Sequence, residues 1–128
     1  MRSGRVGINM FANVYKDKKV LVTGHTGFKG SWLTTWLLEL GAEVCGISID
    51  IPTSPSMFEE LNLEVKIKHN IADIRDLSRI KEIVHGFKPD FVFHLAAQAI
   101  VSTSYSDPLD TISTNVMGTA NVLETLRT

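Results

Sequence analysis

Three glycines at three-residue intervals are the residues of this sequence that point most clearly to chemistry. Gly24, Gly27 and Gly30 lie in the run GHTGFKG, directly after the apolar segment VLVT. A loop backbone that approaches a pyrophosphate closely has no room for Cβ atoms, and the free N–H groups of a following helix face the negative charge. The spacing is GxxGxxG and not the GxGxxG of the commoner dinucleotide fingerprint. The loop therefore predicts a phosphate-binding turn, and a Gly-rich connection without a ligand is the alternative.

The segments around this loop have the patterns of a buried strand and a helix. Residues 19–23 (KVLVT) are short, β-branched and almost wholly apolar, which is typical of a buried parallel strand. After the loop, apolar side chains recur at one-, three- and four-residue steps, which predicts that they form one face of a helix ending at Gly41. These side chains are Trp32, Leu33, Trp36, Leu37 and Leu40.

An acidic residue follows the next predicted strand, residues 42–49. This residue, Asp50, lies twenty positions beyond Gly30, where the carboxylate of an NAD site accepts hydrogen bonds from the adenosine ribose. The same charge would repel the 2′-phosphate of NADP, so the sequence predicts NAD as the cofactor. A solvated loop acid is the alternative interpretation of Asp50 taken alone.

Strand and helix patterns continue to alternate along the rest of the chain. The predicted elements are a turn-rich stretch at 51–56, a short helix at 57–63, an edge-like strand at 65–69, a helix at 77–87 capped by Asp76, a fully buried strand at 91–97, a loop at 98–106, and a helix that starts at Asp107-Pro108. The last helix has a long apolar stripe formed by Leu109, Ile112, Val116, Ala120, Leu123 and Leu126. The alternation predicts an α/β fold with a Rossmann-like, doubly wound parallel sheet, truncated after about four strands.

This topology divides the sequence into two parts. Residues 1–18 are predicted to be an N-terminal extension, with Met1 or Met10 as the start, and residues 19–128 to be a partial NAD-binding domain. Ligands of doubly wound sheets bind at the carboxyl ends of the strands. Gly24, Asp50, Asp73 and the pair Ala96-Ala97 each follow one of the four predicted strands, so we expect them along one edge.

Composition excludes several classes of partner. Thirteen Lys and Arg against fourteen Asp and Glu give a formal charge of −1, which offers no electrostatic basis for binding nucleic acid or an anionic membrane. No segment has the roughly twenty uninterrupted apolar residues that a transmembrane helix needs. The one cysteine, Cys45, lies in the apolar second strand and is interpreted as a core residue, not as a metal ligand or nucleophile. A lone cysteine fits a reducing, cytoplasmic location.

The motifs taken in order resemble those of the extended short-chain dehydrogenase/reductases. They are GHTGFKGSWL, DIRD, FHLAAQ and DP followed by TNVMGTANVLE, and the similarity covers roughly residues 11–127. Within that family the chain is most similar to the CDP-glucose 4,6-dehydratases. The resemblance implies NAD as cofactor, CDP-glucose as substrate, deoxysugar biosynthesis and a homo-oligomer in the complete enzyme.

The resemblance also assigns roles to residues of the NAD site. It implies that the pyrophosphate is bound by Gly24, Thr26, Gly27, Phe28, Lys29 and Gly30. A solvated loop lysine is the alternative interpretation of Lys29. It places Asp50 at the adenosine ribose, Asp73 and Ile74 around the adenine, and Leu95, Ala96 and Ala97 on the nicotinamide side. His94 is expected to be a hydrogen-bonded core histidine, and Asn115 to bridge its helix to the loop after the fourth strand. No metal site is expected.

The catalytic residues of the family are not found at the expected place. The family uses a Ser or Thr and a Tyr-x-x-x-Lys that follow the last predicted helix. Tyr15 and Lys19 match the spacing, but they precede the first strand and cannot reach the nicotinamide. The sequence therefore predicts no catalytic residues and the inactive N-terminal portion of an NAD-dependent lyase. The alternatives are part of another extended nucleotide-sugar epimerase or reductase, and a non-catalytic nucleotide-binding module.

Overall fold

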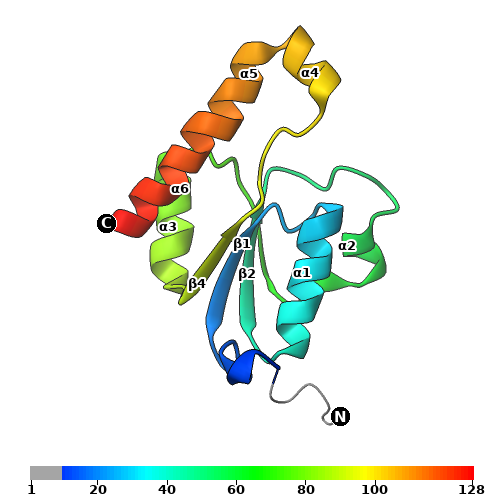
Figure 1. Ribbon diagram of the computed structural model, residues 1–128, viewed down its shortest axis with the longest axis vertical. Coiled ribbons are helices and arrows are strands. Elements are labelled where there is room, and N and C mark those ends of the chain that lie inside the picture. The colour runs from blue at the N-terminus through cyan, green and yellow to red at the C-terminus, as the bar shows by residue number, and fades with distance from the viewer. Residues whose placement is uncertain (1–9) are drawn as a thin grey trace.

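The computed structural model describes residues 10–128 and consists of a parallel sheet between two layers of helices (Figure 1). The strands are β1 (Lys19–Thr23), β2 (Glu43–Ser48), β3 (Lys68–Ile71) and β4 (Phe91–His94). The α-helices are α1 (Phe28–Glu39), α2 (Met57–Glu60), α3 (Leu77–Phe87), α4 (Val101–Ser106), α5 (Pro108–Ile112) and α6 (Gly118–Arg127). The 3₁₀-helices η1 (Met10–Asn13) and η2 (Leu63–Val65) and the π-helix η3 (Ser113–Met117) complete the order. No helix within residues 10–128 is both long enough and apolar enough to cross a membrane.

All strand pairs of the sheet are parallel, and the strand order is β3-β2-β1-β4. The sequence-based prediction of a Rossmann-like doubly wound sheet is thus confirmed. After β3 the chain crosses back to form β4 on the other side of β1. The switch point of the sheet therefore lies at the carboxyl ends of β1 and β4. Figure 1 shows α1 and α2 on one face of the sheet and α3 and α6 on the other.

Alternate residues of the central strands fill two separate cores. Leu21 and Ile47 face α3 and α6, whereas Val20, Val22 and Val44 face α1. Each of these five side chains is at most 1% exposed, because β1 and β2 are covered on both faces. Cys45 is buried in the core on the α3 side, as predicted, and burial raises the pKa of its thiol to about 11.

The part of the predicted N-terminal extension that the structure describes packs on the domain. The Tyr15 ring lies 5.1 Å from that of Phe91, and the Phe11 ring lies 5.6 Å from that of Trp36. The Asp17 backbone N–H donates to the Gly41 carbonyl. Residues 1–9 of the predicted extension lie outside the described residues.

Two helical predictions differ from the structure. Helix α1 buries Gly30, Ser31, Thr34 and Leu37, and its tryptophans are about half exposed, so the predicted face of Trp32 and Trp36 was wrong. The small residues are buried instead because they let the helix lie close to the glycine loop. The predicted loop at 98–106 is also wrong, since residues 101–106 form α4.

Two strand predictions were wrong in extent or burial. The third strand spans 68–71 and not 65–69, because the chain first makes η2, which places Leu63 in the core and leaves Val65 73% exposed. The fourth strand ends at His94 and is only half-buried along its length. Within residues 10–128 it borders β1 alone, so one of its edges is uncovered.

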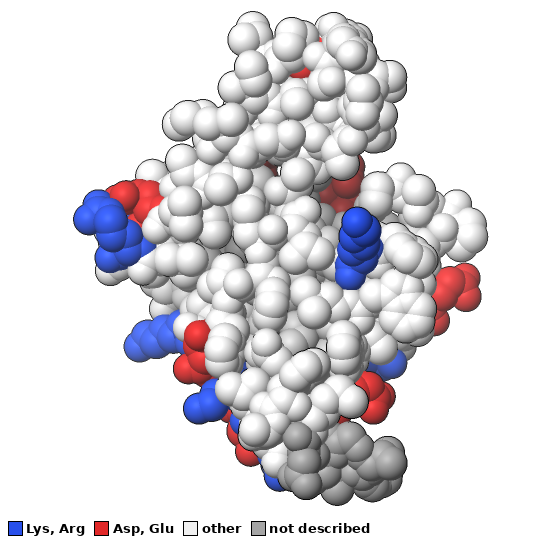
Figure 2. Space-filling view, in the orientation of Figure 1, with Lys and Arg blue, Asp and Glu red and all other residues white. Residues whose placement is uncertain are grey.

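The long helix predicted after Asp107 is divided into α5, η3 and α6. A π-turn adds a residue to the helical repeat, so the apolar positions before and after it do not share one buried face. Helix α6 buries Gly118, Val122 and Thr125, whereas Leu109 and Leu123 of the predicted stripe are exposed. Figure 2 shows that the surface over α4 and α5 carries few charged side chains.

Candidate functional site

A cavity of about 220 Å³ lies at the carboxyl edge of the sheet, where the four strands end. It is lined by residues that follow all four strands. Nine of the twelve predicted site residues line it: Gly24, Thr26, Gly27, Asp50, Asp73, Ile74, Leu95, Ala96 and Ala97. The other three, Phe28, Lys29 and Gly30, form the first turn of α1 beside this cavity and do not line it.

The three glycines of the loop differ in whether their surroundings leave room for a Cβ atom. Gly24 has φ +78°, and a Cβ there would lie 2.8 Å from the Ala96 nitrogen. A Cβ on Gly30 would lie 2.1 Å from the Gly24 carbonyl oxygen, so this glycine lets α1 pack on the loop. A Cβ on Gly27 would meet only the Gly24 oxygen, at 3.5 Å. Packing therefore does not require glycine at position 27, and the space above it is open to a ligand.

The glycine loop is joined to the segment after β2 by hydroxyl groups. The Thr26 hydroxyl donates to the Asp50 carbonyl at 2.6 Å and lies 2.7 Å from the Ser48 hydroxyl. These buried contacts fix the backbone at Asp50 relative to the loop. The Asp50 side chain is left exposed at the cavity wall, as a ribose ligand requires.

His25 of the glycine loop is a buried histidine that packs against β2 and β3. His25 is fully buried, its Nε2 lies 2.7 Å from Nδ1 of His69 in β3, and its ring lies edge-on to that of Phe58. A Cβ on Gly46 would lie 2.4 Å from the His25 ring, so β2 has a glycine where the imidazole sits. Burial, with a further contribution from His69, lowers the pKa of His25 to about 4. His25 thus shapes the loop as a neutral side chain.

The segment after β3 is positioned by α6. The Asn121 side-chain amide donates to the backbone carbonyls of Ile74 and Arg75, both at 3.1 Å. Gly118 leaves the space that the Ile74 side chain occupies, since a Cβ there would lie 2.5 Å from it. Ile74 is therefore held at the cavity by a helix that begins more than forty residues later.

The loop after β4 is positioned through Thr23 and His94. The Thr23 hydroxyl accepts hydrogen bonds from the backbone N–H groups of Leu95 and Ala96, both at 3.1 Å. Its own proton is then available for His94 Nδ1, 2.6 Å away, which leaves the ring proton on Nε2 to be donated to the Thr119 hydroxyl at 3.0 Å. Burial lowers the pKa of His94, which favours this neutral form. The prediction of a hydrogen-bonded core histidine is confirmed.

Asn115 bridges the π-helix to the same loop, as predicted. Its side-chain oxygen accepts from the Gln98 backbone N–H at 2.7 Å, and its amide donates to the Gln98 carbonyl at 3.0 Å. The Gln98 side chain donates to the Thr111 hydroxyl at 2.9 Å. Residues 94–98 are thus held from β1, α5, η3 and α6 together.

Tyr15 and Lys19 do not belong to this site. Lys19 is the first residue of β1, at the opposite end of the strand from Gly24, and Tyr15 packs on Phe91 at that same opposite end. Their Tyr-x-x-x-Lys spacing is therefore coincidental, as predicted. Within residues 10–128, no group of three or more His, Cys, Asp or Glu side chains is arranged to hold a metal ion.

Sequence reasoning missed several residues of the site. The cavity is also lined by Ser48, Ile49, Pro52, Ala72 and Thr114. The first four adjoin predicted strand ends, so a wider window around each end would have included them. Thr114 lies on the π-helix and carries no such signal.

Comparison with known proteins assigns the chain to a family. The sequence model of the family described as GDP-mannose 4,6 dehydratase matches residues 21–128. The chain belongs to this family. It is therefore an extended short-chain dehydrogenase/reductase, as the motifs indicated.

Individual relatives agree with this assignment. The chain is 51% identical over 115 residues to a CDP-glucose 4,6-dehydratase of Salmonella typhimurium, an alignment that covers 90% of this chain and 32% of the relative. It is 34% identical to a GDP-mannose 4,6-dehydratase of Vibrio cholerae, covering 86% and 31% of the two chains. The chain thus spans about a third of the length of the curated relatives that it matches.

Solved structures share the same fold. The crystal structure of the UDP-glucose 4-epimerase of Thermus thermophilus in complex with NAD aligns with a TM-score of 0.76 and 33% identity, over 85% of this chain and 33% of that one. An epimerase of Methanothermobacter thermautotrophicus aligns with a TM-score of 0.81 and 31% identity, over 98% and 36%.

Proposed function

We propose that this chain forms the NAD-binding region of a nucleotide-sugar 4,6-dehydratase that acts on CDP-glucose. One observation carries the proposal: a single cavity at the carboxyl edge of the sheet brings together nine predicted site residues from four separate strand ends. The 51% identity to a CDP-glucose 4,6-dehydratase supports the choice of sugar nucleotide. The buried free thiol of Cys45 is compatible with work in the cytoplasm.

The residues around the cavity fit NAD. The open space above Gly27 and the first turn of α1 offer the pyrophosphate backbone N–H groups and the positive end of a helix dipole. Asp50, Asp73 and Ile74 line the cavity, where Asp50 would accept from the ribose and the other two would lie around the adenine. When bound, NAD supplies reversible hydride transfer, which in a 4,6-dehydratase removes hydrogen from C4 of the glucosyl unit and returns it to C6.

Asp50 provides the test of this proposal. A carboxylate that faces the 2′-phosphate of NADP costs several kcal/mol at an effective dielectric near 20, so NAD should bind on the order of a thousandfold more tightly than NADP. Calorimetric titration of both cofactors should show this preference in the wild type. Asp50→Ala should weaken NAD binding and narrow the difference in affinity between NAD and NADP. The matched control Glu64→Ala removes an exposed carboxylate outside the cavity and should change neither the NAD affinity nor that difference.

The outcomes of this titration separate clearly. Equal affinities for NAD and NADP in the wild type, or an Asp50→Ala variant that binds NAD unchanged, would show that the carboxylate is not at the ribose. Absence of saturable binding of either cofactor would reject the proposed function as a whole.

We further expect this chain to have no dehydratase activity by itself. A dehydratase needs acid–base groups at the reacting sugar, and the one Tyr-x-x-x-Lys of this sequence lies at the opposite end of the sheet. Purified chain incubated with CDP-glucose and NAD should therefore yield no 4-keto-6-deoxy product. Detection of that product would contradict the assignment.

A nucleotide-sugar epimerase is the second candidate. The structural similarity to UDP-glucose 4-epimerases, at 33% and 34% identity, favours it. The higher identity to the CDP-glucose 4,6-dehydratase makes dehydration the better choice.

A further inference from the structure

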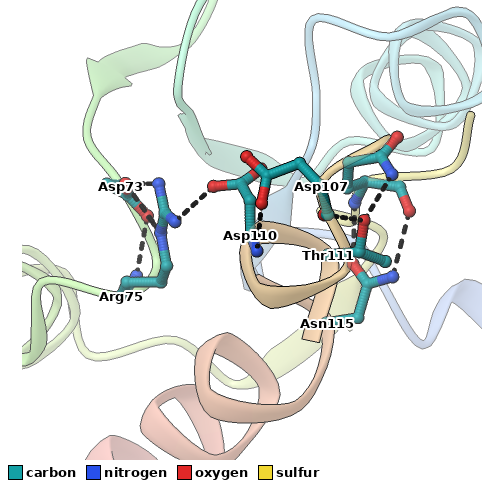
Figure 3. Close-up of polar contacts among 7 residues, drawn as sticks. Asp73, Arg75, Asp107, Asp110, Thr111 and Asn115 are labelled. Carbon is teal, nitrogen blue, oxygen red and sulfur yellow. Dashed lines mark hydrogen bonds and ion pairs between the residues drawn. The ribbon is translucent and has the colours of Figure 1, made fainter. Parts of the chain in front are cut away.

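Arg75 makes contacts that the cofactor site described above does not explain. Its guanidinium binds the Asp73 carboxylate through Nε and Nη2, at 3.0 and 2.7 Å, and its backbone N–H donates to Asp73 Oδ1 at 2.9 Å. Its remaining Nη1 donates to Asp110 Oδ1 at 2.7 Å. Figure 3 shows Arg75 between these two carboxylates, which come from the end of β3 and from α5.

These contacts determine what Asp73 can still accept. Hydrogen bonds from Arg75 hold the pKa of the Asp73 carboxyl below its ordinary value, so the group stays a carboxylate and can only accept. A carboxylate has about four lone-pair positions, and Arg75 brings three N–H groups to them: the backbone N–H on Oδ1, one Nη2–H on Oδ2, and the Nε–H, which is shared between Oδ1 and Oδ2 at 3.0 Å each. The oriented carboxylate therefore has room for about one further donor, such as an exocyclic amino group, and none for a carbonyl oxygen.

The second anchor of Arg75 is itself fixed. Asp107 caps α5 by accepting from the Asp110 backbone N–H at 3.1 Å, which holds the first turn that carries Asp110. Two residues of the same helical segment, Thr111 and Asn115, which Figure 3 labels, bind Gln98 in the loop after β4. Arg75 thus joins the end of β3 to the segment that holds this loop.

We propose that Arg75 is a positioning residue that fixes the Asp73 carboxylate at the cavity wall and so makes the site select a purine with an amino group at position 6. This inference rests on the proposed NAD site. A base with a carbonyl at that position, as in hypoxanthine, would face an acceptor and leave two unpaired lone pairs. Because Arg75 is anchored on α5 through Asp110, loss of either contact loosens the carboxylate and lowers selectivity.

The test compares NAD with nicotinamide hypoxanthine dinucleotide, which differs at this position of the base. Calorimetry on the wild-type chain should show about tenfold or greater preference for NAD, as expected for a hydrogen bond to a charged acceptor. Arg75→Ala should reduce the preference to below about threefold. Arg75→Lys should restore only part of it, because an ammonium cannot bind two carboxylates as a planar fork does.

Two further variants keep the result interpretable. Asp110→Asn leaves the Arg75–Asp73 pair in place and should lower the preference by about twofold. Arg79→Ala, a control on α3 whose side chain pairs with Glu82 away from the cavity, should leave it unchanged. Circular dichroism and melting temperature report folding of each variant, and Asp110→Asn decides the question if Arg75→Ala does not fold.

Selectivity that is unchanged in folded Arg75→Ala, or in Asp110→Asn when that variant decides, would overturn the proposal, even with a lowered melting temperature. Tight binding of both dinucleotides by the wild type without discrimination would overturn it as well. Failure of the wild type to bind either dinucleotide would instead reject the proposed NAD site.

Discussion

Strands β2 and β4 have similar apolar sequences and both pair in parallel with β1, yet their environments differ. In β2, Cys45 and Ile47 are at most 1% exposed, whereas Phe91, Val92 and Phe93 of β4 are half-buried. The cause is their neighbours: β2 lies between β1 and β3, and β4 borders only β1 among the described strands. Apolar residue type predicts a strand, but the number of covered sides decides how deeply it is buried.

The largest expected effect is at Gly30, a buried residue in the first turn of α1. In Gly30→Ala the new methyl group would lie 2.1 Å from a backbone carbonyl oxygen, which no side-chain movement relieves. We expect a loss of about 4 kcal/mol or more of unfolding free energy in a urea titration. Gly27→Ala is the matched control, because its methyl group has ordinary contact distances. It should fold normally and lose NAD affinity, and a Gly30→Ala protein of wild-type stability would refute the packing argument.

The second effect tests the comparison of the two strands directly. Ile47→Ala removes a fully buried side chain from the core and should cost about 3 to 4 kcal/mol of unfolding free energy. Val92→Ala, at a half-buried position of β4, should cost about 1 kcal/mol or less. Chemical denaturation of both variants measures the two values. Similar losses of unfolding free energy in the two variants would mean that β4 is covered in solution to the same extent as β2.

The third effect is a pH dependence of the unfolding free energy that originates in the buried residue His25. The pKa of His25 is about 4 in the folded chain against an ordinary value of 6.5, so between these values the unfolded chain binds more protons. The contribution of His25 to the unfolding free energy should therefore be fully present above pH 6.5 and be lost as the pH falls toward 4, a loss of about 3 kcal/mol from this group. Urea unfolding at pH 7 and pH 5 measures most of this change and avoids most carboxyl titrations. His25→Phe should reduce the slope to the part that other groups contribute, among them His94, whose pKa burial also lowers. An unaltered slope in that variant would assign the whole effect to those other groups.

The smallest effect on stability is expected at the exposed surface of α5. Leu109 is 79% exposed on α5, so Leu109→Ser should change the unfolding free energy by no more than about 0.5 kcal/mol. The same surface has few charges (Figure 2), and we expect it to cause self-association at high concentration. Sedimentation should show less association in the variant than in the wild type. A wild-type chain that is monomeric at every concentration would contradict this expectation.

The parts of the fold that the sequence predicted well are those governed by local rules. The turn at Gly24, the cap at Asp76 and the helix start at Asp107 were all correct, because glycine conformation and side-chain capping depend on a few neighbouring residues. The nine residues that gather at the cavity were predictable because parallel strands bring their carboxyl ends together.

The predictions that failed depended on distant partners. The pattern of Trp32 and Trp36 predicts a buried face, but only the assembled structure shows that Ser31 and Thr34 are buried instead. Arg75 and Asn121 support the site through residues 35 and 47 positions away, a separation at which neither periodicity nor spacing gives a signal. The π-turn at residues 113–117 likewise has no local sequence pattern that separates it from an α-helix.

The burial of Cys45 gives this protein an internal reporter of its own opening. It is the only thiol in the sequence and lies in the middle of β2, and the pKa of about 11 keeps it protonated at neutral pH. A thiol reagent can therefore react only when the central sheet separates. The labelling rate, measured without any engineered probe, would report how often the core opens, and its slowing by added NAD would measure how strongly the cofactor holds the core closed.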